Sequence, residues 1–487
     1  MHIAISNLDL TIVVVYLLAT VAFGLAFGQK QGDVKDYLLG GGKLPWWALL
    51  GSIVGTETST ATFLSVPGLA YAANGGDLRF LQLSLGYIVG RFVVVLLILP
   101  HYFRGELLTS YEVLNSRFGG PTKMTASLLF LVTRNLADGL RLYLAAIVLE
   151  QVAGLPLTWS VIVMGVVILL FTFFGGMRSV VWNDCVQLVV YLGGAVLAGA
   201  IIVSRLPGGW QQFVEFGSAH DKFRMLDFST DLTQNFTFWS GLVGGMFLTM
   251  GTHGTDQLMV QRLLGARSCR EAGFALSLSG LFVFVQFLLF LLLGVGLAAY
   301  FAEFPPTAAF ASNDQVFATF IVSHMPVGAV GLTLAAVLAA ALSSSLNAAA
   351  AAAMNDIYRP FCRTPPSPDQ LMLVTRVLTV VFGFVQIGVG IAGQHFSKNV
   401  VNDVLAIAGF TTGIILGVFL LGILTRHVSQ KAALVGLVGG LAIMTGIKFG
   451  TTLAWPWFTI VGSSATFGLG LMASVLFPIQ VAKEAEV

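Results

Sequence analysis

The chain has 487 residues, of which 56% are hydrophobic and only 10% are charged, and its mean hydropathy is +0.87. This composition excludes a soluble globular domain and indicates an integral membrane protein. The formal net charge of +2 does not distinguish between functional classes, whereas the distribution of the basic residues along the chain is informative.

Apolar stretches long enough to cross a bilayer recur along the whole chain. One helical span needs about 20 apolar residues, and we predict about thirteen such spans. Their approximate limits are 7–27, 46–71, 78–101, 124–150, 158–174, 179–204, 236–259, 272–302, 326–353, 370–393, 400–424, 431–450 and 457–477. The spans are too long for barrel strands and do not alternate apolar with polar residues, so we predict an all-α membrane protein.

The second predicted span, residues 46–71, is interrupted by polar residues at its middle. Residues 55–60 read Gly-Thr-Glu-Thr-Ser-Thr. A charge at the bilayer centre costs about 3 kcal/mol, and backbone leaves the helix there only where it lines a cavity or is buried in protein. We therefore predict a broken helix with a polar site at mid-depth. The alternative is a continuous helix whose hydroxyls bond to their own backbone, which would leave Glu57 without a partner.

Charged side chains also occur within other predicted spans. Arg134, Asp138 and Arg141 lie at positions i, i+4 and i+7 of one span, so Asp138 can reach both arginines. Charges within spans face protein or water, and these three either line a solute pocket or form a structural ion network. Arg91 is a further charge within a span, and we assign it only a structural partner.

The order of the spans predicts an internal repeat. Spans two to six and spans seven to eleven are two units of five helices, and because five is odd they have opposite topology. The first span of the second unit carries a polar stretch at residues 251–256, which matches the break of the first unit. Interrupted helices at corresponding positions of inverted repeats mark the binding site of a secondary transporter. The predicted parts are a peripheral segment 1–45, repeat one 46–205, an external loop 206–235, repeat two 236–426, and two peripheral spans with a short tail 427–487.

Basic residues are concentrated in alternate loops. With the N-terminus outside, 16 of the 25 Lys and Arg residues fall in cytoplasmic segments, 6 in external segments and 3 within spans. This bias predicts a multi-pass protein of the plasma (cytoplasmic) membrane, with the N-terminus outside and the C-terminus in the cytoplasm. Cys185, Cys269 and Cys362 then lie near the reducing side, so no disulfide is expected.

Several motifs resemble those of the sodium/solute symporter family, which includes sodium/glucose, sodium/proline and sialic-acid symporters. They are DYLLGGG at 36–42 with LPWW at 44–47, GG at 175–176 with VWND at 181–184, GTDQ at 254–257 with Gln261 and Arg262, Asn347 with NDIYR at 355–359, and GVFLLG at 417–422. They follow the family's order and spacing. The resemblance implies the 5+5 inverted-repeat fold of the bacterial leucine transporter, and import of a small polar organic solute with sodium.

The resemblance also implies two cation sites, and hard cations prefer oxygen ligands. At the family's common sodium site, carbonyl groups of Gly55, Thr58 and Val337 would bind the ion. The two hydroxyls expected there are missing, because Ala340 and Ala341 occupy their positions. We therefore expect this site to bind a cation weakly, through carbonyl groups alone.

The second site of the family would use Asp184, Ser343 and Ser344, all of which are present. A different register would move the two serines into the first site, but Asn347 and Asp356 argue against it. Two plainer interpretations stay open: Asp184 as a helix N-cap, and the serines as small residues at a helix interface.

The solute site and a gate are assigned by the same resemblance. We predict that the solute contacts Thr56, Glu57, Arg134, Asp138 and Arg141, with Arg141 as the main contact. The two positive and two negative charges among them favour a neutral or zwitterionic solute, or an anion that travels with the cation. A gate or interhelix network is predicted from Asp256, Gln257, Gln261 and Arg262, with plain anchoring as the alternative for Arg262. His253, a lone histidine in the second break, is predicted to be structural rather than a proton relay.

Other functional classes lack their motifs. The sequence contains no phosphate-binding loop of the type G-x-x-x-x-G-K-[ST], no Cys/His cluster with metal spacing and no nucleic-acid-binding patch. We predict a sodium-coupled transporter rather than an enzyme, with no cofactor apart from sodium, which is also the only metal. Its partners would be the solute and the lipid bilayer, not nucleic acid, and a monomer would suffice. The alternatives are a proton-coupled symporter using Glu57 or Asp184, and a transporter-like membrane sensor.

Overall fold

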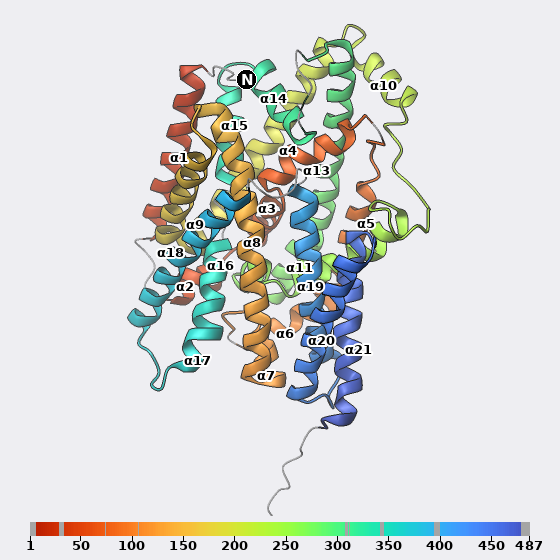
Figure 1. Cartoon of the computed structure of the whole chain (residues 1–487). Coiled ribbons are helices and arrows are strands. Elements are labelled where there is room, and N and C mark those ends of the chain that lie inside the picture. Colours follow the sequence, from red (N-terminus) through yellow and green to blue (C-terminus); the bar gives the residue numbers. More distant parts are fainter. Residues whose placement is uncertain are drawn as a thin grey trace, which may run out of the picture.

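The computed structural model describes residues 6–28, 34–73, 75–105, 107–306, 310, 312–340, 345–393 and 400–478. Over these residues the protein is an elongated bundle of helices (Figure 1). The described part contains no β-strand, only two isolated bridges, Leu44 with Ala266 and Val428 with Pro478. The prediction of an all-α protein is confirmed.

The helices follow one another with short connections. The α-helices are α1 Asn7–Gly28, α2 Val34–Leu39, α3 Trp46–Glu57, α4 Thr60–Tyr71, α5 Leu81–Val93, α6 Leu99–Tyr102, α7 Glu112–Phe118, α8 Gly120–Ala153, α9 Leu157–Arg205, α10 Gly209–Ala219, α11 Gly245–Gly254, α12 Gln257–Leu264, α13 Cys269–Glu303, α14 Asp314–His324, α15 Ala329–Ala340, α16 Ser345–Ala352, α17 Arg359–Phe361, α18 Pro368–Ala392, α19 Val400–Leu424, α20 Gln430–Gly450 and α21 Phe458–Leu476. The π-helical turns are η2 Val94–Ile98, η3 Ser240–Gly244 and η4 Ala353–Tyr358, and the 3-10 turns are η1 Gly40–Gly42 and η6 Trp455–Trp457.

Seven stretches of the described residues are long and apolar enough to cross a membrane. They are Leu81–Tyr102, Gly176–Arg205, Cys269–Glu303, Pro368–Ala392, Ala406–Leu424, Gln430–Gly450 and Trp455–Leu476. Three shorter apolar helices, Asn7–Thr20, Leu157–Phe173 and Ala329–Leu338, accompany them. These lengths and compositions are those of a multi-pass membrane protein.

The predicted break in the second span is present. Helix α3 ends at Glu57, and Thr58 has non-helical backbone angles of φ −79° and ψ 61°. Ser59 then caps α4 by accepting a hydrogen bond from the Thr62 amide at 3.4 Å. The interpretation of 46–71 as one continuous helix is therefore wrong, because the polar residues satisfy the backbone groups of two separate helix ends.

A second break and a kink interrupt two other helices. Helix α11 ends at Gly254, and Asp256 caps α12 by accepting from the Leu258 amide at 2.8 Å. Helix α9 joins the predicted spans 158–174 and 179–204 through a kink at Gly176, whose φ of 61° only glycine adopts readily. Figure 1 places α3 and α11 near the middle of the bundle.

Helix α1, predicted to be peripheral, holds one end of α15. Asp9 is buried, and its Oδ1 accepts hydrogen bonds from the amides of Gly328 and Gly331, both at 2.7 Å. A carboxylate stabilises a helix N-terminus because it pairs with free amides and with the positive end of the helix dipole. The acidic residue of the first span is thus part of the support for the helix that carries Val337.

Aromatic side chains fill the space behind the first break. The Phe63 ring of α4 lies 4.7 Å from the Tyr191 ring, 5.5 Å from the Phe290 ring and 5.0 Å from the Phe317 ring, measured between centroids. Ring pairs at these distances add to the effect of burying apolar surface. This packing fixes α4 against α9, α13 and α14, and it therefore positions the start of α4, which forms one side of the break.

Candidate functional site

A cavity of about 160 Å³ lies where the two broken helices meet. Among the predicted residues it is lined by Thr56, Glu57, Arg134, Arg141 and Asp256. Its other polar lining comes from Ser59, Thr62, Thr249, Thr252 and His253. The fold therefore brings together residues from α3, α4, α8 and α11 that are up to about 200 positions apart in the chain.

A second, narrower space adjoins the first and shares Thr56, Ser59 and Arg141 with it. Its lining includes Gly55, Asp138 and Asp184. All five residues predicted to contact the solute thus line one space or the other. Ser345, Gln187 and Gln386 also line the second space, and the sequence analysis did not assign them to the site. Ser345 directly follows Ser343 and Ser344, which are predicted to bind the cation, and this adjacency is the sequence feature that could have indicated it.

Glu57 belongs to a buried network that joins four helices, α3, α5, α11 and α13. Both carboxylate oxygens of Glu57 accept from Arg91 Nη2 at 2.5 Å, and Oε1 lies 3.0 Å from His253 Nε2. Other nitrogen atoms of Arg91 and His253 also have partners. Arg91 Nη1 donates to Ser279 Oγ at 2.9 Å, and His253 Nδ1 lies 3.0 Å from Thr252 Oγ1. Glu57 therefore has a partner that its own helix could not supply. The structural interpretations of Arg91 and His253 agree with these contacts.

We expect Glu57→Gln to lower the yield of folded protein sharply, because it leaves the fully buried Arg91 guanidinium without a counter-charge. Breaking a buried pair on one side costs roughly 3–5 kcal/mol. The double variant Glu57→Gln/Arg91→Met should recover part of that yield. The measurement is the monodisperse fraction of detergent-extracted protein in size-exclusion chromatography.

Ser279→Ala is the matched control, since it removes one neutral hydrogen bond from the same guanidinium. It should lower the yield much less than Glu57→Gln does. If the yield of Glu57→Gln/Arg91→Met is as low as that of the worse single variant, the unpaired Arg91 charge does not account for the loss of folded protein.

The three charges of α8 form one ion-paired group, but the two arginines differ in their surroundings. Arg134 donates twice to Asp138, at 2.7 and 2.6 Å, and its Nη1 lies 3.7 Å from Asp256 Oδ2. Arg141 reaches the same carboxylate once, at 3.1 Å. The Arg141 side chain is 27% exposed and that of Arg134 is 9% exposed, and within the described residues Arg141 Nε has no hydrogen-bond partner. Arg141 therefore retains donors for a ligand, whereas Arg134 is held by two carboxylates.

Asp184 lies beside the broken helix and is paired with Arg262, one of the residues predicted to form a gate or network. Its Oδ2 accepts from Arg262 Nη2 at 3.0 Å, from Ser52 Oγ at 2.6 Å and from Thr56 Oγ1 at 3.3 Å. Arg262 is fully buried and also donates to Ser52 Oγ at 2.9 Å. Helix α9 continues through Asp184, so the interpretation of Asp184 as a helix N-cap is wrong. The Arg262 guanidinium crosslinks α3, α9 and α12, and both interpretations, a gate and plain anchoring, stay predictions.

The backbone groups predicted for the common sodium position lie around the first break. Thr60 Oγ1 donates to the Val337 carbonyl at 2.8 Å, which joins α4 to α15. Gly55 packs so closely on α9 that an added Cβ would lie 2.7 Å from the Asp184 carbonyl oxygen. Thr58 Oγ1 donates to the Val54 carbonyl at 2.7 Å and accepts from Gln286. Ala341, Ser343 and Ser344 lie outside the described residues, so the serine part of the second cation site stays a prediction.

The other residues of the predicted gate or network, Gln257 and Gln261, connect α12 to neighbouring segments of the chain. Gln257 Oε1 accepts from the Ser110 amide at 2.7 Å, and its Nε2 donates to the Leu108 carbonyl at 3.1 Å. Gln261 Nε2 donates to the Leu38 carbonyl of α2 at 2.6 Å. These contacts tie α12 to the loop before α7 and to the peripheral segment 1–45.

Comparison with known proteins identifies the family. The family model described as "Sodium:solute symporter family" matches residues 37–440. The chain belongs to the sodium:solute symporter family. This finding confirms the resemblance stated above, and with it the prediction of a sodium-coupled secondary transporter rather than an enzyme, with sodium as the coupling ion.

Individual members of the symporter family match over nearly the whole chain. The chain is 28% identical to the human (Homo sapiens) sodium/iodide cotransporter over 463 residues, which covers 92% of this chain and 70% of the relative. It is 26% identical to the sodium/sialic acid symporter SiaT of Proteus mirabilis (strain HI4320) over 483 residues, covering 95% and 94% of the two chains. A solved structure of a Na+-coupled sialic acid symporter, in a substrate-bound outward-open state with a novel Na+ site, superposes with a TM-score of 0.88 at 26% identity. That superposition covers 98% of this chain and 100% of the other.

Proposed function

We propose that this symporter imports a small polar organic anion, most simply a carboxylate, together with sodium. The observation that carries the proposal is Arg141, which lines both spaces and is only singly paired with Asp138. A guanidinium with free donors binds carboxylates through short charge-assisted hydrogen bonds. The relatives compared above are named for sialic acid and iodide, both of which are anions, and this agrees with an anionic solute.

The coupling ion is proposed to bind at Asp184 with Ser343 and Ser344, and more weakly at the carbonyl groups of Gly55, Thr58 and Val337. Thr56 supports this arrangement because its hydroxyl donates to Asp184 while its side chain lines both spaces. A cation at Asp184 and an anion at Arg141 would stabilise each other. Coupling of this kind is reciprocal, so the solute would raise sodium affinity by the factor by which sodium raises solute affinity.

The proposed architecture is that of about thirteen spans in two inverted five-helix repeats, with the boundaries given above. The breaks at α3/α4 and α11/α12 support it, since each begins its proposed repeat. We also propose that a single chain in the bilayer is sufficient, since helices α3, α4, α8 and α11 of one chain converge on the cavity.

Solute uptake into proteoliposomes tests the function. The panel contains short monocarboxylates, sialic acid, iodide, a neutral sugar and a zwitterionic amino acid, each offered under an inward sodium gradient and under choline. We expect an organic anion to accumulate only with sodium. Accumulation of the neutral or zwitterionic solutes alone would contradict the anion proposal. Uptake that ignores sodium but follows a proton gradient would contradict sodium coupling.

Single cysteines test the proposed orientation, in a variant whose three native cysteines are replaced by serine. Ser218 and Arg363 are both exposed, and position 222 is unsuitable because Lys222 is buried with its Nζ bonded to carbonyl groups at the end of α4. We expect an impermeant maleimide to label Ser218→Cys on intact cells and Arg363→Cys only after permeabilisation. Labelling of both from one side would overturn the inverted-repeat topology.

A further inference from the structure

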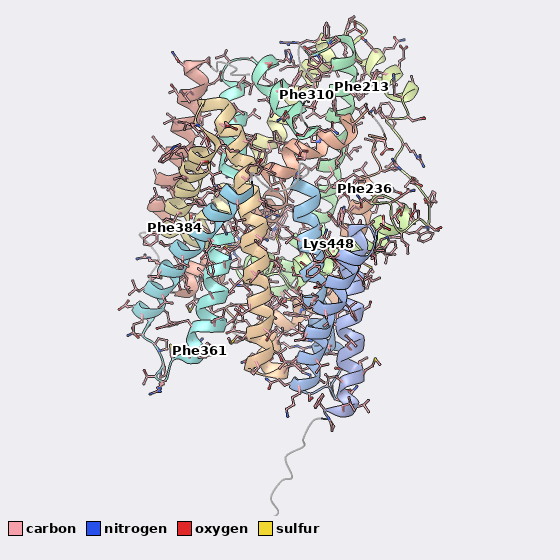
Figure 2. All side chains as sticks on the ribbon, viewed as in Figure 1. Phe213, Phe236, Phe310, Phe361, Phe384 and Lys448 are labelled. Carbon is pink, nitrogen blue, oxygen red and sulfur yellow. The ribbon has the colours of Figure 1, made fainter. Side chains whose placement is uncertain are left out.

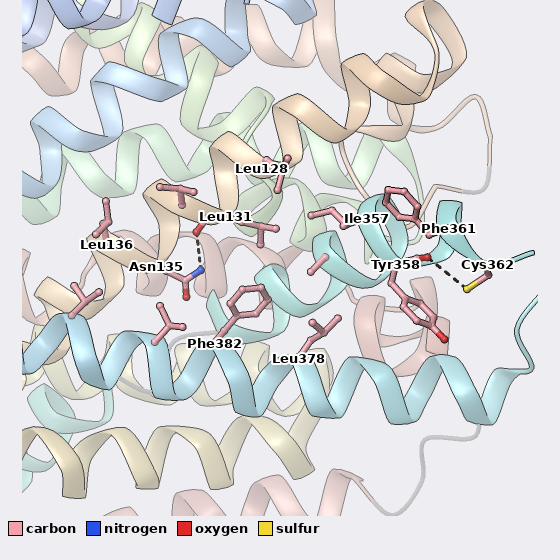
Figure 3. Close-up of a pocket in the computed structure, with 14 residues that line it drawn as sticks. Leu128, Leu131, Asn135, Leu136, Ile357, Tyr358, Phe361, Cys362, Leu378 and Phe382 are labelled. Atoms are coloured by element: carbon pink, nitrogen blue, oxygen red, sulfur yellow. Dashed lines mark hydrogen bonds between the residues drawn. The ribbon is translucent and has the colours of Figure 1, made fainter. Parts of the chain in front are cut away.

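A large apolar groove lies on the outside of the bundle, and residues of α8 line one side of it. Its volume is about 770 Å³, and it runs between α8, the η4–α17 segment and α18. Leu128, Leu131 and Leu136 of α8 form one wall, and Leu378 and Phe382 of α18 form the other (Figure 3). The groove has the size of a binding site for an organic molecule, and nothing in the transport mechanism uses it.

The surroundings of the groove are those of a surface that faces hydrocarbon. Helix α18 is long and apolar enough to cross the membrane. Next to the groove it exposes Val377 and Phe384, and α8 exposes Val132 at 61%. Figure 2 shows Phe361 and Phe384 at the outer edge of the bundle. In the bilayer such a surface is covered by acyl chains, so an acyl chain is the molecule that has direct access to the groove.

One end of the groove carries positive charge and aromatic rings. Tyr358, Phe361 and Cys362 line that end, as seen at the right of Figure 3. Arg359 and Arg363 are their immediate neighbours in the chain and are exposed. Arg359 makes one long hydrogen bond, 3.3 Å to Asn355 Oδ1. Asp356 lies three residues before Arg359, but it is buried and paired with Lys123 at 3.6 Å. Asp369 lies in the first turn of α18, and among the described residues neither Arg359 nor Arg363 forms a salt bridge with an acid.

We propose that this groove binds one acyl chain of an anionic phospholipid, whose phosphate is bound by Arg359 and Arg363. Aromatic residues at the level of the headgroups and basic residues beside an apolar groove are the features that retain anionic lipids. The acyl chain would lie along Leu131, Leu378 and Phe382. The guanidinium groups would pair with the headgroup at the surface of the same leaflet.

The bound lipid would lie close to the transport site, because one hydrogen bond separates the two. Asn135 lines the groove, and its Oδ1 accepts from Gln386 Nε2 at 3.3 Å. Gln386 in turn lines the narrower space with Asp138 and Arg141. Filling the groove would therefore favour the packing of α18 on α8 seen here, and the lipid would raise the uptake rate without contacting the solute.

Native mass spectrometry of the purified full-length protein tests the site, with phosphatidylglycerol and phosphatidylcholine added at equal concentration. We expect retention of one phosphatidylglycerol per chain in preference to phosphatidylcholine. Arg359→Gln/Arg363→Gln should weaken phosphatidylglycerol binding about thirtyfold, because each basic residue near an anionic headgroup contributes roughly fivefold. The control Arg267→Gln/Arg270→Gln removes the same charge from exposed positions elsewhere and should bind like the wild type.

A second pair of variants tests the groove itself. Val385→Trp fills the groove from an exposed position on α18 and should reduce bound lipid, whereas Val381→Trp, on the same helix but outside the groove, should not. Unchanged phosphatidylglycerol binding in the double arginine variant, or in Val385→Trp, would overturn the proposal. The proposal would also be overturned if the wild-type protein were a dimer and Val385→Trp dissociated it, because the groove would then be an interface between two chains. Lipid binding is measured without transport, so a negative result for the lipid site can be distinguished from a negative result for the proposed organic-anion uptake.

Discussion

Asp184→Asn should abolish the stimulation of uptake by sodium. The side chain keeps its size and one acceptor oxygen, but it loses the full negative charge that a sodium ion needs in a buried site. At the proposed first cation position Ala340 and Ala341 supply no hydroxyls, so we expect that position to bind sodium too weakly to substitute for Asp184. The measurement is the initial rate of solute uptake into proteoliposomes as a function of external sodium.

Arg262→Gln is the control that separates ion binding from the ion pair. It removes the partner of Asp184 but leaves the carboxylate in place, so we expect slower uptake that is still stimulated by sodium. Ser52→Ala, which removes a neutral hydrogen bond from the same carboxylate, should change the half-saturating sodium concentration only a few-fold. If folded Arg262→Gln also loses all sodium dependence, Asp184 acts through the ion pair and our assignment of the cation site is wrong.

Arg141→Lys should raise the apparent KM for the solute about tenfold or more, while the yield of folded protein stays near normal. A hydrogen bond to a charged group contributes roughly 1.5–3 kcal/mol, and an ammonium cannot reproduce the planar fork of the guanidinium. Arg141 is partly exposed and makes a single contact with Asp138, so its replacement leaves the rest of the ion-paired group intact. Initial rates at saturating sodium over a range of solute concentrations give the KM.

Arg134→Lys is the matched substitution on the same helix. Because Arg134 is buried and paired with both Asp138 and Asp256, we expect that change to lower the folded yield first. A KM for Arg141→Lys that equals the wild-type KM, with equal losses of yield in both variants, would show that all three charges are structural. The solute contact would then have to be sought on α3 or α11.

Several features of this protein follow from the sequence alone, because the interactions behind them are local. The apolar spans follow from composition, and the break at residues 55–60 follows from the cost of placing polar groups in hydrocarbon. The pairing of Arg134 and Arg141 with Asp138 follows from helical spacing, which any α-helix fixes. The family follows from motifs that are contiguous in the chain.

Only the tertiary structure decided which distant groups pair. Glu57 pairs with Arg91 and His253. Asp184 pairs with Arg262 of α12, which lies 78 residues away in the chain, and the motif that contains Arg262 does not reveal this pairing. A buried charge must be neutralised by a neighbouring group, so the sequence predicts that each of these charges has a partner. Which neighbour does so depends on how the helices cross. The same packing opens the apolar groove beside α8, for which no periodicity in the chain gives a signal.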